Sequence, residues 1–143
     1  MKKLSLGLFI LITAGAMAAT MQENALKYVP AGKIVQEEKN EFKVETPNGT
    51  IVEIELKSNG EFDEASGDSV DKDIFVPGEG LLSLSDTVAV VTKSGKKLTG
   101  DWSLDKSWFK GWHYEFEGIE NGKKMDYVVD AKTGKILEQK LDD

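Results

Sequence analysis

The sequence contains no cysteine and no arginine, and its one histidine is His113. Without cysteine, disulfide bonds, cysteine-based zinc sites and thiol catalysis are excluded. Without arginine, no bidentate guanidinium clamp can hold a phosphate or a carboxylate. The chain also lacks a G-x-S-x-G elbow and the glycine-rich phosphate loops. We therefore expect a non-enzymatic protein with no cofactor.

Long apolar runs are absent except at the N-terminus. Lys2 and Lys3 precede an apolar run from Leu4 to Ile12, and a small-x-small cleavage site follows at residues 16–18. This pattern predicts a signal peptide over residues 1–19, and the alternative is an uncleaved N-terminal anchor. No later stretch approaches the roughly 18 apolar residues that a membrane span needs. We expect a periplasmic or secreted protein with no membrane span after cleavage.

All 18 basic residues are lysines, and the formal net charge is −7. Loss of the signal peptide would remove two of these lysines and make the chain more acidic. Such a surface repels nucleic acid and anionic lipid and favours basic or neutral partners. The expected partner is thus another extracytoplasmic protein of unknown identity. The alternative is that the charge only keeps the protein soluble.

One short pattern occurs twice, at Asn48–Gly60 (NGTIVEIELKSNG) and at Asn121–Gly134 (NGKKMDYVVDAKTG). Each copy opens with an Asn-Gly turn, continues as an alternating apolar strand and closes with a second glycine turn. The apolar positions fall at equal offsets in the two copies. They are Val52, Ile54 and Leu56 in the first, and Met125, Tyr127 and Val129 in the second. This repetition predicts a duplicated antiparallel module.

Two helices complete this prediction. The first covers residues 21–29, with Thr20 as N-cap and Glu23 closing a capping box. The second starts near Ser83 or Ser85 and ends at Lys93, although its valine-rich sequence is also compatible with a strand.

We therefore predict an α+β fold of two tandem copies, each a helix packed on a roughly four-stranded antiparallel sheet. The expected domains are residues 20–66, an acidic linker at 67–82, and residues 83–143. Whether the two copies share one sheet is left open.

Alternation also predicts which side chains point away from the helices. The outward positions form a broad acidic surface if the two sheets lie side by side, and His113 at such a position should be solvated. We expect a basic patch of a partner to meet this surface. The outward residues are Lys43, Glu45, Glu53, Glu55, His113, Glu115 and Glu117.

Trp108 and Phe109 are adjacent in a segment, residues 105–111, that reads as a long loop. Exposed aromatic pairs are typical anchors for a protein partner. The alternative is that both rings fold back as a lid over the core.

The predicted linker region carries a group of acidic side chains, of which Asp68, Asp71 and Asp73 are candidate calcium ligands. Calcium binds clustered carboxylates, but the spacing is not that of an EF-hand. A solvated acidic linker is the default interpretation.

The C-terminal segment WHYEFE, followed by MDYVVDAKTGKILE, resembles the PepSY domain family. Val129-Asp130-Ala131 and Thr133-Gly134 match the turn typical of that family. Residues 29–62 resemble PepSY-like domains related to β-lactamase-inhibitory proteins, but Leu56-Lys57-Ser58 replaces the Val-Asp-Ala of the second copy. The resemblance implies a non-enzymatic extracytoplasmic module that restrains or binds a peptidase or another hydrolase. It transfers no catalytic or contact residue to this chain.

The sequence thus favours an exported PepSY-like module that binds or inhibits an extracytoplasmic protein such as a peptidase or another hydrolase. The alternative is a periplasmic sensor of a cation or a small ligand. An enzyme is disfavoured because no base–nucleophile pair or metal set can be assembled from these residues.

Overall fold

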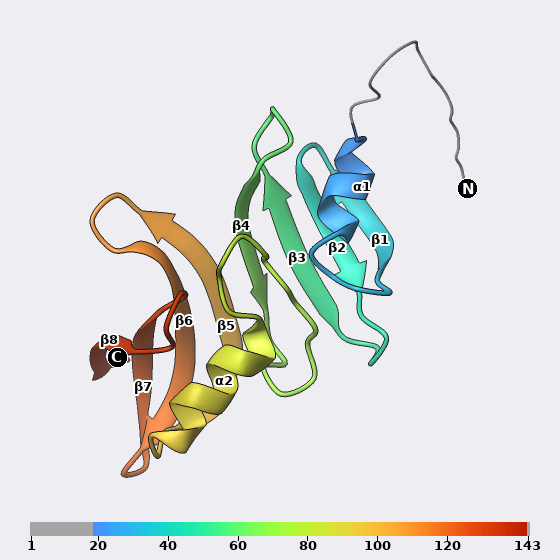
Figure 1. The fold of residues 1–143 in the computed structure, drawn as a ribbon. Helices are drawn as coiled ribbons and strands as arrows, with labels where there is room; N and C mark the ends of the chain where they lie inside the picture. Colours follow the sequence, from blue (N-terminus) through green and yellow to red (C-terminus); the bar gives the residue numbers. More distant parts are fainter. Residues whose placement is uncertain (1–18, 143) are drawn as a thin grey trace.

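The computed structural model describes residues 19–142, so the predicted signal peptide lies outside the described residues except for Ala19. The described chain forms one eight-stranded antiparallel sheet in which the strands lie in chain order, β1 to β8 (Figure 1). The elements are α1 Met21–Leu26, β1 Lys33–Glu38, β2 Glu41–Glu45, β3 Ile51–Leu56, β4 Phe62–Gly67, α2 Leu84–Lys93, β5 Lys97–Ser107, β6 Gly111–Glu120, β7 Lys123–Asp130 and β8 Ile136–Leu141.

The predicted α+β fold, with two copies of a helix on a four-stranded sheet, is wrong. The structure is β-rich, with one continuous sheet and two small helices of six and ten residues. The sheet continues because β4 pairs with β5 through Ala65–Leu104, Ser66–Ser103 and Gly67–Trp102. Two edge strands that carry compatible alternation gain hydrogen bonds by pairing, and pairing also removes two exposed edges.

Both helices begin where the sequence predicts. The Thr20 side chain accepts a hydrogen bond from the Glu23 backbone N–H, and the Glu23 side chain accepts one from the Thr20 backbone N–H. Ser83 caps α2 in the same way through the Asp86 backbone N–H. The first helix ends three residues earlier than predicted, at Leu26.

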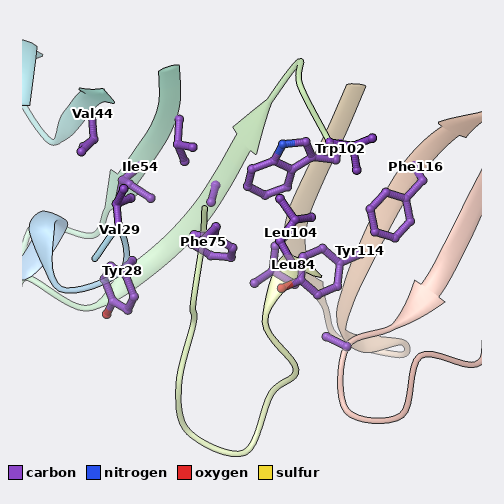
Figure 2. Packing of buried hydrophobic residues seen from close by; sticks show 14 of the residues in the cluster. Tyr28, Val29, Val44, Ile54, Phe75, Leu84, Trp102, Leu104, Tyr114 and Phe116 are labelled. Carbon is purple, nitrogen blue, oxygen red and sulfur yellow. The ribbon is translucent and has the colours of Figure 1, made fainter. Parts of the chain in front are cut away.

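The two helices and the segment that leads into α2 lie on the same side of the sheet, which we call the inner face (Figure 1). Alternate side chains of the strands pack beneath them as one core (Figure 2). A run of aromatic rings joins the two halves of this core. Its centroid separations are 5.9 Å for Phe62–Phe75, 5.3 Å for Phe75–Trp102 and 5.4 Å for Phe62–Trp112.

Residues 68–83 connect β4 to α2 and pack against the inner face. Phe75 is fully buried, and the Asp73 Oδ2 atom accepts a hydrogen bond of 2.7 Å from Trp102 Nε1. The Tyr114 hydroxyl donates to the Leu82 carbonyl oxygen at 2.8 Å. The interpretation of this region as a solvated linker is therefore wrong. Its buried Phe75 and the hydrogen bond between Asp73 and Trp102 hold it against the sheet.

The predicted loop at residues 105–111 is also shorter than expected. Strand β5 extends to Ser107 and β6 begins at Gly111, so Trp108, Phe109 and Lys110 form the tip of a hairpin. Within the described residues, neither helix has the length and apolar composition needed to cross a bilayer.

Candidate functional site

The outer face of the sheet, opposite the helices, carries no helix of residues 19–142 (Figure 1). Its side chains alternate with those of the core, so the strand register decides which of them become neighbours. This face brings together residues from both halves of the chain because the sheet is continuous.

A row of five carboxylates crosses this face at right angles to the strands. Glu38 pairs with Glu41, Glu41 with Glu55, and Glu55 with Glu64. The pairing of Ala65 with Leu104 places Asp105 next in line on β5. We call Glu38, Glu41, Glu55, Glu64 and Asp105 the acidic row.

The acidic row is electrostatically unfavourable in the isolated protein. Burial raises the pKa of Glu64, and the negative charges of Asp105, Glu55, Asp63 and Glu41 raise it further. Burial likewise raises the pKa of Glu55, with added repulsion from Asp63, Glu41 and Asp105. Like charges directly opposite one another destabilise a sheet.

No lysine neutralises the row within the described part of the chain. The ion pairs there are Lys96–Glu120, Lys110–Glu138 and the His113–Glu115 contact, and none includes a member of the row. Glu41, Glu55 and Glu64 instead line a recess together with Glu53, Ile54 and Ser66. An unpaired carboxylate row around a recess attracts cationic groups.

Other predicted outward carboxylates lie elsewhere on the same face. Glu53 faces Lys43 across β2 and β3, while Glu115 faces Ser103 and Val128. Glu117 faces Asp126, which places a second negative group near β7 and β8. The continuous sheet therefore gathers Glu53, Glu55, Glu115 and Glu117 on one face, although not in one row.

The prediction that the His113 side chain is solvated is wrong. It points to the outer face between Asp105 and Asp130, yet only 4% of its surface is exposed. Its Nδ1 atom lies 3.0 Å from the Gly111 carbonyl oxygen, and its Nε2 atom lies 3.3 Å from Glu115 Oε2. These contacts leave His113 little surface to offer a partner.

Trp108 and Phe109 stand at the tip of the β5–β6 hairpin and are 93% and 67% exposed. Their rings meet edge to face with centroids 5.4 Å apart, and Lys110 Nζ lies 5.5 Å from the Phe109 ring centroid. In the structure the pair therefore does not act as a lid over the core. Asp105 lies near the end of β5 in the same hairpin, so the tip stands to one side of the last member of the acidic row, further along the strand direction.

The calcium candidate is not brought together by the fold. Asp68 and Asp71 are exposed, whereas Asp73 is buried and bonded to Trp102. Within residues 19–142, the group of three acidic side chains whose oxygens all lie within 4.8 Å of one another is Glu117, Asp126 and Asp142. Burial raises the pKa of Asp126, and the neighbouring Asp142 adds to this.

Sequence reasoning missed Glu38, Glu41, Glu64 and Asp105. The tight turn at residues 39–40 places Glu38 opposite Glu41 and was available as a signal. Glu64 was not predictable, because a register shift between Glu55 and Leu56 decides its partner. Asp105 was missed because its segment was predicted to be a loop, so it was not assigned to a face of the sheet.

Comparison with known proteins gives a match for part of the chain. Residues 88–140, from within α2 to β8, match the PepSY family model, described as "Peptidase propeptide and YPEB domain". The predicted resemblance is confirmed for this part, and the tandem arrangement stays a prediction. No curated protein and no solved structure matches the chain at a significant level.

Proposed function

We propose that this protein is an exported, non-enzymatic module that binds a basic surface of another extracytoplasmic protein through the outer face of its sheet. The acidic row is the observation that carries this proposal. Five carboxylates stand in a line without a lysine among them, at a cost in stability that a cationic partner would remove.

The PepSY match supports the class of partner. PepSY domains are in general propeptide-like or inhibitor-like modules rather than catalysts, and residues 88–140 match their family model. The proposed partner is accordingly a peptidase or another hydrolase of the cell envelope or exterior. The exposed Trp108–Phe109 pair adds an apolar contact beside the row, since aromatic anchors commonly dominate binding energy.

Charge-reversal variants test this proposal. The protein and a Glu53→Lys, Glu55→Lys, Glu115→Lys, Glu117→Lys variant are used to capture partners from an envelope extract at low and high salt. A Glu79→Lys variant is the control, because Glu79 is exposed in the segment that leads into α2 on the inner side of the sheet.

A partner held by the wild type and the control, released by salt and lost from the outer-face variant, would support the proposal. Binding to that partner should also depend less on salt in the variant, because fewer charges meet across the interface. Equal retention by all three proteins would rule out docking on this face.

A cation sensor remains the second candidate, and it now rests on Glu117, Asp126 and Asp142 rather than on the predicted linker. Calcium that binds the native state must raise the melting temperature in a concentration-dependent way. We expect Asp142→Asn to abolish such a rise, since it removes one of the three charged ligands. A calcium-independent melting temperature would eliminate this candidate.

A further inference from the structure

The spacing of the acidic row limits the shape of its partner. Neighbouring strands lie about 4.8 Å apart, so five carboxylates on five adjacent strands span about 19 Å. The row crosses β1 to β5: Glu38, Glu41, Glu55 and Glu64 face one another in turn across strand pairs, and Asp105 follows next to the Ala65–Leu104 pair. A partner that pairs one cation with each carboxylate must present five charges over this length.

A helix meets this requirement better than an extended chain. Lysines at helix positions 1, 5, 8, 12 and 15 lie on one side and span about 21 Å at a rise of about 1.5 Å per residue. Five same-side lysines of an extended strand span about 26 Å, because same-side positions recur roughly every 6.6 Å. The flexible lysine stem can take up the smaller mismatch of the helix.

A second observation marks one end of the row. Asp105, its last member, lies three residues before Trp108, whose side chain is 93% exposed at the hairpin tip. Lys110, at the same tip, is held 3.0 Å from Glu138 and so presents little free positive charge to a cationic partner. The tip is offset from Asp105 by about 10 Å along the strand direction, which is about the diameter of a helix with its side chains, so an apolar residue near one end of the helix, on the flank that faces the tip, would meet this aromatic pair.

We propose that the acidic row and the Trp108–Phe109 tip together bind a cationic helix of about four turns that carries an apolar residue at one end. This inference rests on the proposed function and deepens it by naming the partner's chemistry and secondary structure. The alternative occupants, a cationic extended segment or a cationic loop, are outcomes of the test below.

Two synthetic peptides of identical composition test the inference. Both are alanine-based, carry five lysines and end in a leucine. The first has lysines at positions 1, 5, 8, 12 and 15, and the second has lysines at alternate positions, which share one side only in an extended chain. Calorimetry at low salt measures affinity, and circular dichroism measures helix formed on binding.

We expect the first peptide to bind at least about tenfold tighter than the second and to gain helix content when bound. Glu38→Lys and Glu41→Lys, both at exposed positions, should each abolish this preference, while Glu79→Lys preserves it. Trp108→Ala should weaken binding several-fold without changing its salt dependence, because it removes an apolar contact and no charge.

Equal affinity for the two peptides, or tighter binding of the alternating one, would overturn the helical partner and leave the cationic one standing. Unchanged affinity of Trp108→Ala would remove the tip from the binding surface. If neither peptide binds at low salt, the proposed docking of a cationic segment fails as well.

Discussion

Asp73 shows how one side chain holds a long connection in place. Its Oδ2 atom accepts hydrogen bonds from Trp102 Nε1 at 2.7 Å and from the Ser69 backbone N–H at 3.2 Å. Its Oδ1 atom is buried without a hydrogen-bond partner among the described residues. A Cβ atom on Gly67 would overlap Asp73 Oδ2 and lie 2.5 Å from Trp102 Nε1, so the contact also requires glycine there.

Replacing Asp73 by alanine should lower the free energy of unfolding by about 1–3 kcal/mol, because the buried Trp102 N–H and the part-buried Ser69 N–H lose their acceptor. Urea denaturation measures this change. The matched control is Asp71→Ala at an exposed position in the same segment, which we expect to change stability by less than about 0.5 kcal/mol. Equal effects of the two changes would contradict an anchoring role for Asp73.

Glu64 connects the acidic row to the pH dependence of stability. Its pKa is raised in the folded state by burial and by neighbouring carboxylates, so its ionised form is less favourable in the folded protein than in the unfolded chain. This loss of stability is fully present above the pKa that Glu64 has in the folded protein. It disappears below the ordinary pKa of glutamate, about 4.3. We expect Glu64→Gln to stabilise the protein by roughly 0.2–1 kcal/mol at pH 7 and by nothing once the pH falls below that value.

Glu120→Gln is a control of opposite sign. The pKa of Glu120 is lowered, first by its hydrogen bond from Lys96 and then by one from the Tyr127 hydroxyl. Its stabilising contribution is therefore present above the unfolded pKa and is lost as the pH falls through the folded pKa. Urea titrations of both variants between pH 7 and pH 3 measure how the free energy of unfolding depends on pH. If its change relative to the wild type follows the same pH dependence in both variants, this account of the row is refuted.

At the scale of elements, the turn between β7 and β8 packs closely against α2. Asp130 accepts hydrogen bonds from Thr133 Oγ1 and from the Lys132 backbone N–H, which shapes the turn. Gly134 follows with a φ of 80°, and a Cβ atom there would lie 2.8 Å from the Val90 Cβ atom of α2. The turn that carries the PepSY resemblance is thus a packing contact for the helix.

Gly134→Ala should therefore destabilise the protein more than Gly122→Ala does. Gly122 has a φ of 76°, and a Cβ atom there would have no neighbour within 4 Å, so its substitution introduces backbone strain alone, at a cost of about 1 kcal/mol. Substitution of Gly134 introduces the same backbone strain, and the new Cβ atom must also displace Val90. Thermal melts of the two variants compare these costs, and indistinguishable midpoints would exclude a contribution from the helix contact.

At the scale of the whole molecule, the continuous sheet and the shared aromatic core make the two halves one folding unit. All three tryptophans, Trp102, Trp108 and Trp112, lie in the second half of the chain. Ile54 lies in β3 and is 1% exposed.

We expect Ile54→Ala to lower stability by about 2–5 kcal/mol and to shift the tryptophan fluorescence transition together with the circular dichroism transition. Coupling follows because unfolding β3 would expose the core that Phe75 and Trp102 share with the second half. A fluorescence midpoint that stays in place while circular dichroism shifts would instead indicate two independent units.

Several local features followed from the sequence alone, because they depend on contacts between near neighbours. The capping box of Thr20 and Glu23 satisfies free N–H groups within one turn, and Ser83 does the same for α2. Alternation in β2, β3 and β6 predicted which side chains enter the core, since successive side chains of a strand point to opposite faces. The PepSY resemblance of the second half was likewise readable from local motifs, and residues 88–140 confirm it.

Only the tertiary structure decided the pairing of β4 with β5, the burial of His113 and Asp73, and the assembly of the acidic row. Each depends on residues distant in the chain: Ala65 meets Leu104, and Asp73 meets Trp102. Local propensity carries no information on such partners, because their choice reflects the burial and the hydrogen bonding of the whole sheet. The same long-range pairing turned scattered glutamates into one continuous surface, and that surface carries the proposed function.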